Sequence, residues 1–488
     1  MTSLVPYNIL HELINNNEYN YRDNIYDFSI LHLACIIGSF DMIIKICSQK
    51  PELINDNNNI FAKVPLTIFL EYNMNSNYLY NITNFFINNY ANINIQDIKG
   101  KTPIYYCIKN LRHNTQYLDI IKLLCLSGAD LDIENINNQT PIHYLFYKYY
   151  IRKKLDNINF NNTVKLLITN QNINKKDKDG CTPLFLTLSI INYYMFKYII
   201  NNYNVDYSIT NNDGLTILSY SILTNLRYIF INDIIKKIKN TDIINIKDLF
   251  GFTSLNYAII RNDTRMIKNL IKYGSDVSHI DNNNLNIIQH SILSKNNINV
   301  ISYIVKKLKK NDMLHLDNQN FNALHYSFYR KNLDIVKIIL DKHVLYKNID
   351  NNDINCAIYN LGSGSKNINI IKQLIQYNND NPMKYLYLSL NTQDNRLTEY
   401  ILTNSKKKGK YFQDSINLLI NFDNLQDLLK IINTCYDINQ NEFKKFGPKI
   451  KSHMILLKNI IYFELVKIIK SDDISRKILS FHPLGLLI

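Results

Sequence analysis

The sequence predicts an all-α solenoid of helix-turn-helix units joined by short hairpin turns, with a short helical C-terminal segment. Three observations support this fold class. A six-residue pattern recurs along the chain, each copy is followed by two apolar segments with helical spacing, and Asp or Asn followed by Gly separates many of the copies. At 488 residues the chain also exceeds the size at which one compact core keeps growing, which favours several domains or an extended array.

The recurring pattern sets the period of the array. Its copies begin at Ser29, Val64, Thr102, Thr140, Thr182, Thr216, Thr253, Asn286 and Asn322. The successive steps are 35, 38, 38, 42, 34, 37, 33 and 36 residues. Periods of this length are typical of stacked helical repeats, in which each unit buries its apolar face against its neighbours. The longest insertion, at residues 147–162, is expected between the two helices of one unit.

Each copy predicts the same local structure. A short apolar helix follows the pattern, and after a polar break comes a second helix with apolar residues at i, i+3, i+4 and i+7, as in TRMIKNLIKYGSDVS from Thr264. Second helices end at Gly128 and Gly274, because glycine can adopt the left-handed conformation that closes a helix. The turns DKDG, NNDG and DLFG place Gly180, Gly214 and Gly251 where the backbone reverses.

The pattern resembles the ankyrin repeat, whose period is about 33 residues and whose signature is T-P-L-H-x-A. The resemblance covers residues 24–350, with about nine repeats and insertions, and SGADLDIENINNQTPIHYL and DGCTPLFLT carry its most specific motifs. In that family the Thr and His of the signature hydrogen-bond within the turn and to the neighbouring repeat. The resemblance therefore implies these contacts for Thr140 and His143.

The same implied contacts extend to two further pairs, with a hydroxyl or an amide in place of the Thr. These pairs are Ser29 with His32 and Asn322 with His325. Other repeats carry different residues at the His position, among them Tyr105 and Phe185. We expect packing to hold those turns together.

The structure of the remaining segments is predicted from how well each one matches the two-helix repeat. Residues 1–23 are expected to be an N-terminal capping half-repeat, and residues 351–440 keep the two-helix rhythm without the Thr-Pro anchor, as degenerate repeats. Residues 441–488 form a basic amphipathic segment.

Two interpretations of residues 441–488 are open. The segment is either a helix that caps the last apolar face or a diverged F-box-like region. Poxvirus ankyrin proteins often end in such a region, called PRANC, which docks on the Skp1 and cullin-1 ubiquitin ligase. ILSFHPLGLLI resembles its start at Pro483 and Leu484, but Gly485 stands where the family has Glu. The resemblance therefore implies a truncated or diverged adaptor.

The sequence contains none of the motifs expected of an enzyme or a metal site. The eleven His form no H-x-x-x-H or H-E-x-x-H, and the seven Cys form no C-x-x-C pair. No G-x-S-x-G, G-x-x-x-x-G-K-[ST] or G-x-G-x-x-G occurs, and GSGSK at 362–366 lacks the strand that a phosphate-binding loop follows. We expect no catalytic residue, metal or cofactor.

Charge and hydropathy narrow the possible partners. The formal net charge is +14, but the Lys residues are spread along the chain, so we expect a solvated basic surface and no nucleic acid. MTSLVPYNILHEL lacks the features of a signal peptide, and no apolar stretch reaches 18 residues. We therefore expect an intracellular protein with no membrane segment.

The repeats, the AT-biased composition and the C-terminal segment together resemble the poxvirus ankyrin family. Members act as host-range or immune-evasion factors by binding host proteins. The resemblance implies a non-enzymatic module that binds host proteins through the concave face of the repeats, in the cytoplasm or nucleus of the host cell. The alternative is an intracellular scaffold of an AT-rich protist or bacterium with no ubiquitin-ligase role.

Four residues are candidate partner contacts. Phe28 and Phe250 lie at expected turn tips, where the stack itself requires no apolar side chain. Arg261 and Arg265 lie in the expected loop between two helices. The alternative for these side chains is local packing against the adjacent hairpin.

Overall fold

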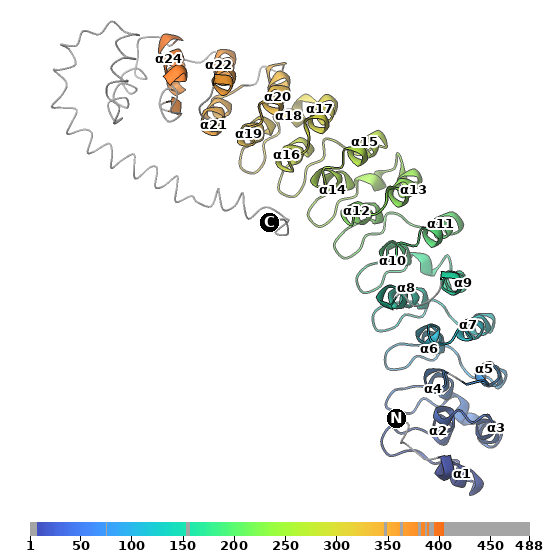
Figure 1. Ribbon diagram of the computed structural model, residues 1–488. Coiled ribbons are helices and arrows are strands. Elements are labelled where there is room, and N and C mark those ends of the chain that lie inside the picture. The colour runs from blue at the N-terminus through green and yellow to red at the C-terminus, as the bar shows by residue number, and fades with distance from the viewer. Residues whose placement is uncertain are drawn as a thin grey trace, which may run out of the picture. The chain divides into compact units, whose positions relative to one another are not determined.

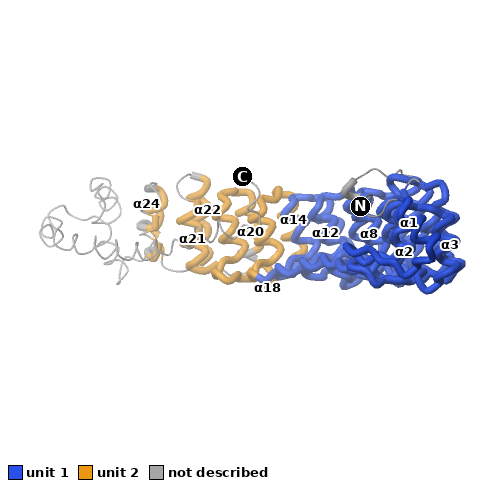
Figure 2. The backbone as a smooth tube through the Cα atoms, turned by 90° about the horizontal axis from the view of Figure 1, so that it is seen from below, with its two compact units in different colours: residues 1–282 blue, residues 283–488 orange. Residues whose placement is uncertain are grey.

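The computed structural model describes residues 7–74, 76–152, 157–345, 349–361, 365–378, 382–385, 388–389 and 395–404. The chain divides into two compact units, residues 1–282 (unit 1) and residues 283–488 (unit 2) (Figure 2). Among the described residues the regular structure is helical, and extended segments pair only in isolated bridges, Arg22 with Ser29 and Thr210 with Thr216. The all-α prediction is confirmed.

Unit 1 consists of two layers of helices, and its hairpin loops extend from the layer of first helices (Figure 1). The first helices are α2 (Ile30–Ile37), α4 (Pro65–Tyr72), α6 (Pro103–Asn110), α8 (Pro141–Arg152), α10 (Pro183–Ser189), α12 (Ile217–Leu223) and α14 (Ser254–Ile260). The second helices are α3 (Phe40–Gln49), α5 (Leu79–Asn88), α7 (Tyr117–Leu126), α9 (Asn157–Leu167), α11 (Tyr193–Asn202), α13 (Tyr228–Ile238) and α15 (Thr264–Lys272). Each first helix packs on the next first helix, and α1 (Tyr7–Asn15) packs against α2 and α3.

Short 3₁₀ helices follow three of the second helices of unit 1. They are η1 (Pro51–Asn55), η2 (Asn172–Asn174) and η3 (Asp242–Asn245). The predicted insertion at residues 147–162 is largely helical, because α8 continues to Arg152 and α9 begins at Asn157.

The first helices begin where the sequence pattern predicts. Thr216 has extended backbone angles (φ −71°, ψ 164°), and its side chain accepts a hydrogen bond from the N–H of Ser219. Such a residue caps a helix by satisfying one of its free N–H groups. The helices α4, α6 and α10 begin with proline, whose missing N–H costs nothing at this position.

The second helices bury one stripe of side chains, and α11 and α15 begin at a capping side chain. Asp263 accepts a hydrogen bond from the N–H of Met266 at the start of α15. The buried residues of α15 are Met266, Ile267 and Leu270, which have the spacing of one helix face. Burial of these stripes against the first helices forms the core of the unit.

Unit 2 continues the same two-helix arrangement. Its helices are α16 (Ile287–Leu293), α17 (Ile298–Lys307), α18 (Lys310–Leu314), α19 (Ala323–Tyr329), α20 (Leu333–Leu345), α21 (Asn351–Leu361), α22 (Ser365–Asn378), η4 (Pro382–Tyr385) and α24 (Asn395–Asn404). Without a Thr-Pro anchor, α21 packs against α19, and α22 packs against α21. Asp350 and Asp353 replace the anchor, since each side chain accepts a hydrogen bond from the other's N–H, at 2.8 and 3.1 Å.

Part of the C-terminal prediction lies outside the described residues. This applies to residues 405–488, which include the basic segment 441–488 and the F-box-like candidates Pro483 and Leu484. Across the described part of the chain, none of the helices combines the length and the apolar character needed to cross a membrane.

Candidate functional site

The hairpins are closed by an Asp or Asn that lies five residues before the recurring pattern. Oδ1 of Asp97 accepts hydrogen bonds from the N–H groups of Lys99 and Lys101, both at 2.8 Å. The same two contacts are made by Asn59, Asn135, Asp177, Asn211, Asp248 and Asp317. Our sequence analysis recognised turn chemistry here but missed this constant spacing, which was the available signal.

Three residues after this side chain the backbone takes a positive φ. The predicted turn glycines have positive φ values: Gly180 (75°), Gly214 (78°) and Gly251 (78°), and at the ends of second helices Gly128 (89°) and Gly274 (103°). Asn138 (55°) and Asn320 (61°) occupy the same hairpin position without glycine. Asn tolerates this conformation better than most residues, which explains the Asn-rich bend that precedes Thr140.

Backbone hydrogen bonds join neighbouring hairpins of unit 1 into a ladder. The N–H of Ile98 donates to the carbonyl of Phe61 at 3.1 Å, and the N–H of Ile136 donates to the carbonyl of Lys99 at 3.1 Å. Equivalent bonds join Ile60 to Tyr26, Lys178 to Asn137, Asn212 to Asp179, Leu249 to Asp213 and Asn282 to Phe250. Residues at the same hairpin position therefore stand in a row.

His143 joins its own turn to the next repeat. Its Nδ1 accepts the N–H of Thr140 at 3.3 Å and lies 2.7 Å from Oγ1 of Thr140. Its Nε2 lies 3.1 Å from the carbonyl of Lys175 and 3.2 Å from that of Cys181. Since Nδ1 is an acceptor, the proton is on Nε2 and the ring is neutral. Burial lowers the pKa of His143 to about 4, against the opposing effect of the two carbonyl contacts.

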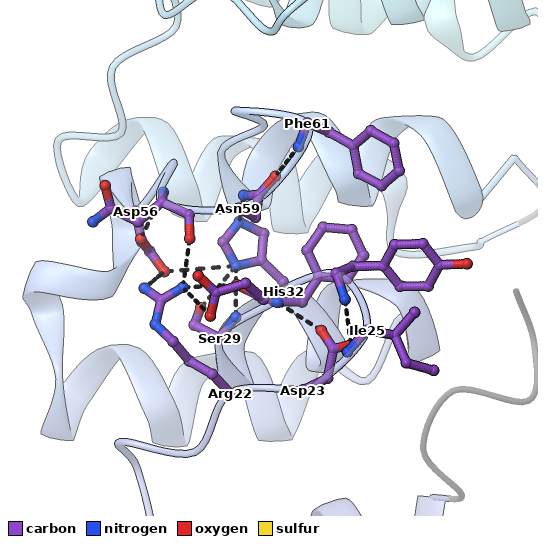
Figure 3. Close-up of polar contacts among 12 residues, drawn as sticks. Arg22, Asp23, Ile25, Ser29, His32, Asp56, Asn59 and Phe61 are labelled. Carbon is purple, nitrogen blue, oxygen red and sulfur yellow. Dashed lines mark hydrogen bonds and ion pairs between the residues drawn. The ribbon is translucent and has the colours of Figure 1, made fainter.

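Ser29 and His32 form the same arrangement in the first repeat (Figure 3). Nδ1 of His32 lies 2.7 Å from Oγ of Ser29, and Nε2 lies 2.8 Å from the carbonyl of Lys63. Burial lowers the pKa of His32 to about 4 as well. In unit 2, Nδ1 of His325 lies 2.8 Å from Oδ1 of Asn322. The three predicted pairs thus hold their turns together, and the rings of all three histidines are buried.

Arg22 ties the first hairpin to the second (Figure 3). Its guanidinium donates to the carbonyls of Asp27 and Asn58, at 2.7 and 2.9 Å, and to Oδ2 of Asp56 at 2.7 Å. Burial would raise the pKa of Asp56, but the hydrogen bonds from Arg22 and from the N–H of Asn58 hold this pKa below its usual value. The pair stabilises the N-terminal end of unit 1.

The expectation that packing alone holds the turn of Tyr105 is wrong. Its hydroxyl donates to the carbonyl of Ile133 at 2.8 Å and to that of Gln139, both in the next repeat. The longer side chain places a donor where His143 places Nε2. Phe185 does pack, with its ring edge-on to that of Tyr220 at 5.6 Å between centroids.

Other residues at the His position also reach the following repeat. Nε2 of Gln289 donates to the carbonyl of Phe321 at 2.8 Å, and Oγ of Ser219 lies 2.9 Å from Oγ of Ser254. The inter-repeat bond is therefore kept by several chemical groups, which a search for histidine does not detect.

A second contact stabilises three of the turns. The hydroxyl of a Tyr in the first helix donates to the turn carboxylate nine residues earlier. The pairs are Tyr106 with Asp97, Tyr257 with Asp248 and Tyr326 with Asp317. Each of these carboxylates therefore accepts hydrogen bonds through both oxygens.

Exposed apolar side chains occupy the tips of the first four hairpins of unit 1 and of the hairpin before α14. They are Ile25 (68% exposed), Ile60 (56%), Ile98 (56%), Ile136 (67%), Leu249 (67%) and Phe250 (63%). Ile60, Ile98 and Ile136 donate consecutive hydrogen bonds of the ladder, so their side chains follow one another along the row. Phe250 was predicted from the sequence and the isoleucines were not, although Ile60, Ile98 and Ile136 each follow the turn residue directly.

The other candidate contacts need correction. Phe28 is fully buried, where its ring stacks on His32, so it is unavailable to a partner. Arg265 lies in the first turn of α15 and covers the ring of Tyr228 at 4.8 Å, outside the loop in which it was expected. Arg261 ends α14 and donates to the carbonyl of Leu223 at 3.0 Å. Both arginines make the local contacts of the alternative interpretation.

Lysine side chains lie against tyrosine rings in neighbouring repeats of unit 1. These residues are Lys63, Lys101, Tyr106, Lys109, Tyr144 and Lys148. Lys63 and Lys101 lie just before α4 and α6, and the other four residues lie on α6 and α8. A cation over a tyrosine ring is attracted by the negative face of the ring.

Groups that could bind a metal or react as nucleophiles are scarce in the described part of the chain. No group of three or more His, Cys, Asp and Glu side chains gathers there. Burial raises the pKa of Cys47 and Cys181 to about 12 and that of Cys125 to about 11, so these thiols stay protonated at neutral pH.

Comparison with known proteins identifies the repeat. Residues 255–355 match a family model described as ankyrin repeats (3 copies), and residues 99–136 match the model of the ankyrin repeat. The chain therefore carries ankyrin repeats, and the fold described above is an ankyrin-repeat solenoid.

Among curated proteins, an ankyrin repeat protein of fowlpox virus (strain NVSL) is 34% identical over 73 residues, which cover 14% of this chain and 11% of that protein. This similarity is consistent with the resemblance to poxvirus ankyrin proteins. Among solved structures, the ankyrin repeat domain of Bcl-3, a member of the IkappaB protein family, matches with 18% identity and a TM-score of 0.40, over 50% of this chain and 99% of that one.

Proposed function

We propose that this chain is a non-enzymatic interaction protein that binds a host protein through the hairpin tips and first helices of unit 1. The observation that carries the proposal is the row formed by Ile25, Ile60, Ile98 and Ile136, which are 56% to 68% exposed. Contiguous apolar groups on a surface mark interaction sites, because water disfavours their exposure. Ankyrin repeats are interaction modules, which supports the same function.

The wider role follows from the viral similarity. The fowlpox match and the AT-biased composition support a host-range or immune-modulating factor in the cytoplasm of the host cell. The alternative, a scaffold of an AT-rich protist or bacterium, is distinguished by the genes that flank this one. Imaging of the tagged protein in infected cells tests the location.

The double variant Ile60→Asp with Ile98→Asp tests the binding surface. We expect it to reduce the amount of each specifically captured host protein at least tenfold, since about 1.4 kcal/mol corresponds to this change and two apolar anchors are lost. The measurement is affinity capture from host cells with quantitative mass spectrometry. Both positions are exposed, so the circular dichroism and the melting temperature should stay close to those of the wild type.

A matched control places the same charges on another surface. Leu126 and Ile158, on the second helices α7 and α9, are 79% and 73% exposed. The double variant Leu126→Asp with Ile158→Asp is expected to capture the wild-type set. Equal capture by the hairpin variant, or equal loss in the control, would contradict the proposed surface.

The resemblance of ILSFHPLGLLI to an F-box start supports a more specific form of this function. In that form, residues 441–488 link the bound host protein to Skp1 and cullin-1. We expect both to co-precipitate with the full-length protein and to be lost from a variant that ends at residue 440. If the shortened variant retains them, the C-terminal segment is not the adaptor.

A further inference from the structure

Two neighbouring repeats each place a tyrosine ring between two lysines. In the first of them, Nζ of Lys63 and Nζ of Lys109 lie 5.1 and 5.8 Å from the ring centroid of Tyr106. The same two ammonium groups bind Glu71, at 2.5 Å from Oε2 and 3.0 Å from Oε1. Burial would raise the pKa of Glu71, but the two lysines hold it below its usual value. The chain thus fills this site with its own carboxylate.

The second site again has a tyrosine ring between two lysines, but a different residue stands at the carboxylate position. Nζ of Lys101 and Nζ of Lys148 lie 4.8 and 5.1 Å from the ring centroid of Tyr144. Lys101 corresponds to Lys63, since each immediately precedes the recurring pattern. The residue that corresponds to Glu71 is Lys109, because each is the seventh residue of its first helix. A cation therefore replaces the carboxylate.

The charges that face Lys101 leave this site positive. Its ammonium group contacts the hydroxyl of Tyr144 at 3.4 Å, and among the described residues it forms no ion pair. Burial lowers the pKa of Lys101, Asp97 raises it, and the nearby Lys148, Lys99 and Lys109 lower it. Near Tyr144 the carboxylates of Glu71 and Asp97 contribute negative charge and Arg112 contributes positive charge, and Glu71 is already bound by Lys63 and Lys109.

Asp97 cannot take the role that Glu71 has in the preceding repeat. Its Oδ1 accepts the N–H groups of Lys99 and Lys101, and its Oδ2 accepts the hydroxyl of Tyr106. Both oxygens are therefore held in the turn. A half-buried ammonium group with several like charges around it is stabilised by an added anion.

We propose that the site formed by Lys101, Tyr144 and Lys148 binds a glutamate or aspartate side chain of the partner protein, in the manner in which Lys63 and Lys109 bind Glu71. The inference rests on the proposed function, in which the partner lies along the hairpin tips. Ile98 and Ile136 belong to the hairpins of the same two repeats and present apolar groups there. The partner segment then combines apolar residues for the tips with an acidic residue for the lysines.

Peptide binding to the full-length protein tests this chemistry. The probe is a fluorescein-labelled peptide of repeated Ala-Leu-Glu-Glu units, compared by fluorescence anisotropy with the same peptide carrying Gln in place of Glu. We expect saturable binding of the Glu peptide, weakened by salt, and at least tenfold weaker binding of the Gln peptide. No saturation by the Glu peptide up to about 1 mM, which is the range of weak recognition, would overturn the proposal.

Two variants locate the binding within the molecule. Lys101→Met removes the half-buried cation. Lys109→Glu places a carboxylate at the position that corresponds to Glu71 in the preceding repeat. Each variant is expected to lower the affinity for the Glu peptide about tenfold. Lys122→Glu changes the charge equally at an exposed position of α7 and is expected to leave binding unchanged. If Lys122→Glu lost as much affinity for the Glu peptide, the effect would come from the net charge of the protein alone. That result would overturn the assigned site.

A third peptide and the host-cell capture complete the test. Tighter binding when phosphoserine replaces Glu would assign the site to phosphate and overturn the carboxylate assignment. Host-protein capture that depends on Ile60 and Ile98 but not on Lys101 would overturn the acidic site and leave the proposed function intact. Capture that depends on none of them would reject the proposed function itself.

Discussion

Lowering the pH from 7 to 5 is expected to cost the repeats that contain His32 and His143 about 2 kcal/mol each in free energy of unfolding. Burial lowers the pKa of both rings to about 4, whereas the ordinary pKa of a histidine side chain is about 6.5. Between these two pKa values the unfolded chain binds more protons than the folded one. The stabilisation is therefore complete above pH 6.5 and is lost as the pH falls towards 4.

The geometry explains why protonation is unfavourable. Nδ1 of His143 accepts the N–H of Thr140 at 3.3 Å, and a protonated Nδ1 would place two donors against each other. The same conflict arises between Ser29 and His32, where the N–H lies 3.2 Å from Nδ1. His279 contributes in the same direction, since burial lowers its pKa as well.

The chain itself provides the control for this prediction. Gln289 occupies the His position, where Oε1 accepts the N–H of Asn286 at 2.8 Å and Nε2 donates to Phe321 at 2.8 Å. The double variant His32→Gln with His143→Gln should therefore keep the contacts without a group that titrates. Urea unfolding at pH 7 and pH 5, followed by circular dichroism, measures the difference between variant and wild type.

Carboxylates titrate in both the wild type and the variant. The contribution of the histidines is therefore the difference between the two proteins in how much free energy of unfolding they lose. We expect the variant to lose about 4 kcal/mol less than the wild type over this range, if the two repeats contribute independently. If both proteins lost the same free energy of unfolding, the rings of His32 and His143 would not be neutral in the folded protein. That result would contradict the hydrogen bonds described above.

The period and the two helices of each repeat could be predicted because they depend on local chemistry. A Thr at an extended position followed by Pro at residues 103, 141 and 183 specifies a helix start wherever it occurs. The spacing of Met266, Ile267 and Leu270 specifies a buried stripe. These signals act within one repeat and need no knowledge of the neighbouring one.

The contacts between repeats were harder to predict, because they depend on whether a side chain can reach a backbone group of the next repeat, about one period further along the chain. Tyr105 replaces His143 as the inter-repeat donor only because its hydroxyl meets carbonyl groups 28 and 34 residues further along the chain. Phe28 was expected at a tip, but the first hairpin is one residue longer: Asp23 accepts the N–H of Phe28, five residues on. The turn therefore carries Phe28 inward and leaves Ile25 outside.

Gly251→Val is expected to destabilise its turn and the two adjoining repeats by about 3 kcal/mol or more, from two separate causes. At φ 78° a β-branched side chain is strained. A Cβ atom would also lie 2.7 Å from the backbone nitrogen of Asn282, and that nitrogen donates the ladder bond to Phe250. The backbone of the next hairpin must move, so hydrogen-exchange protection should fall around both hairpins, since coupling in a solenoid is between neighbours.

Gly128→Val separates the two causes. Gly128 has φ 89°, but no atom lies within 4 Å of the position that its Cβ would take. This variant therefore carries the backbone strain alone, about 1 to 2 kcal/mol, and its effect should stay at the end of α7. The excess loss in Gly251→Val measures the contact between hairpins. Equal unfolding curves for the two variants, or an unchanged melting temperature for Gly251→Val, would contradict the turn register on which the ladder and the row of isoleucines depend.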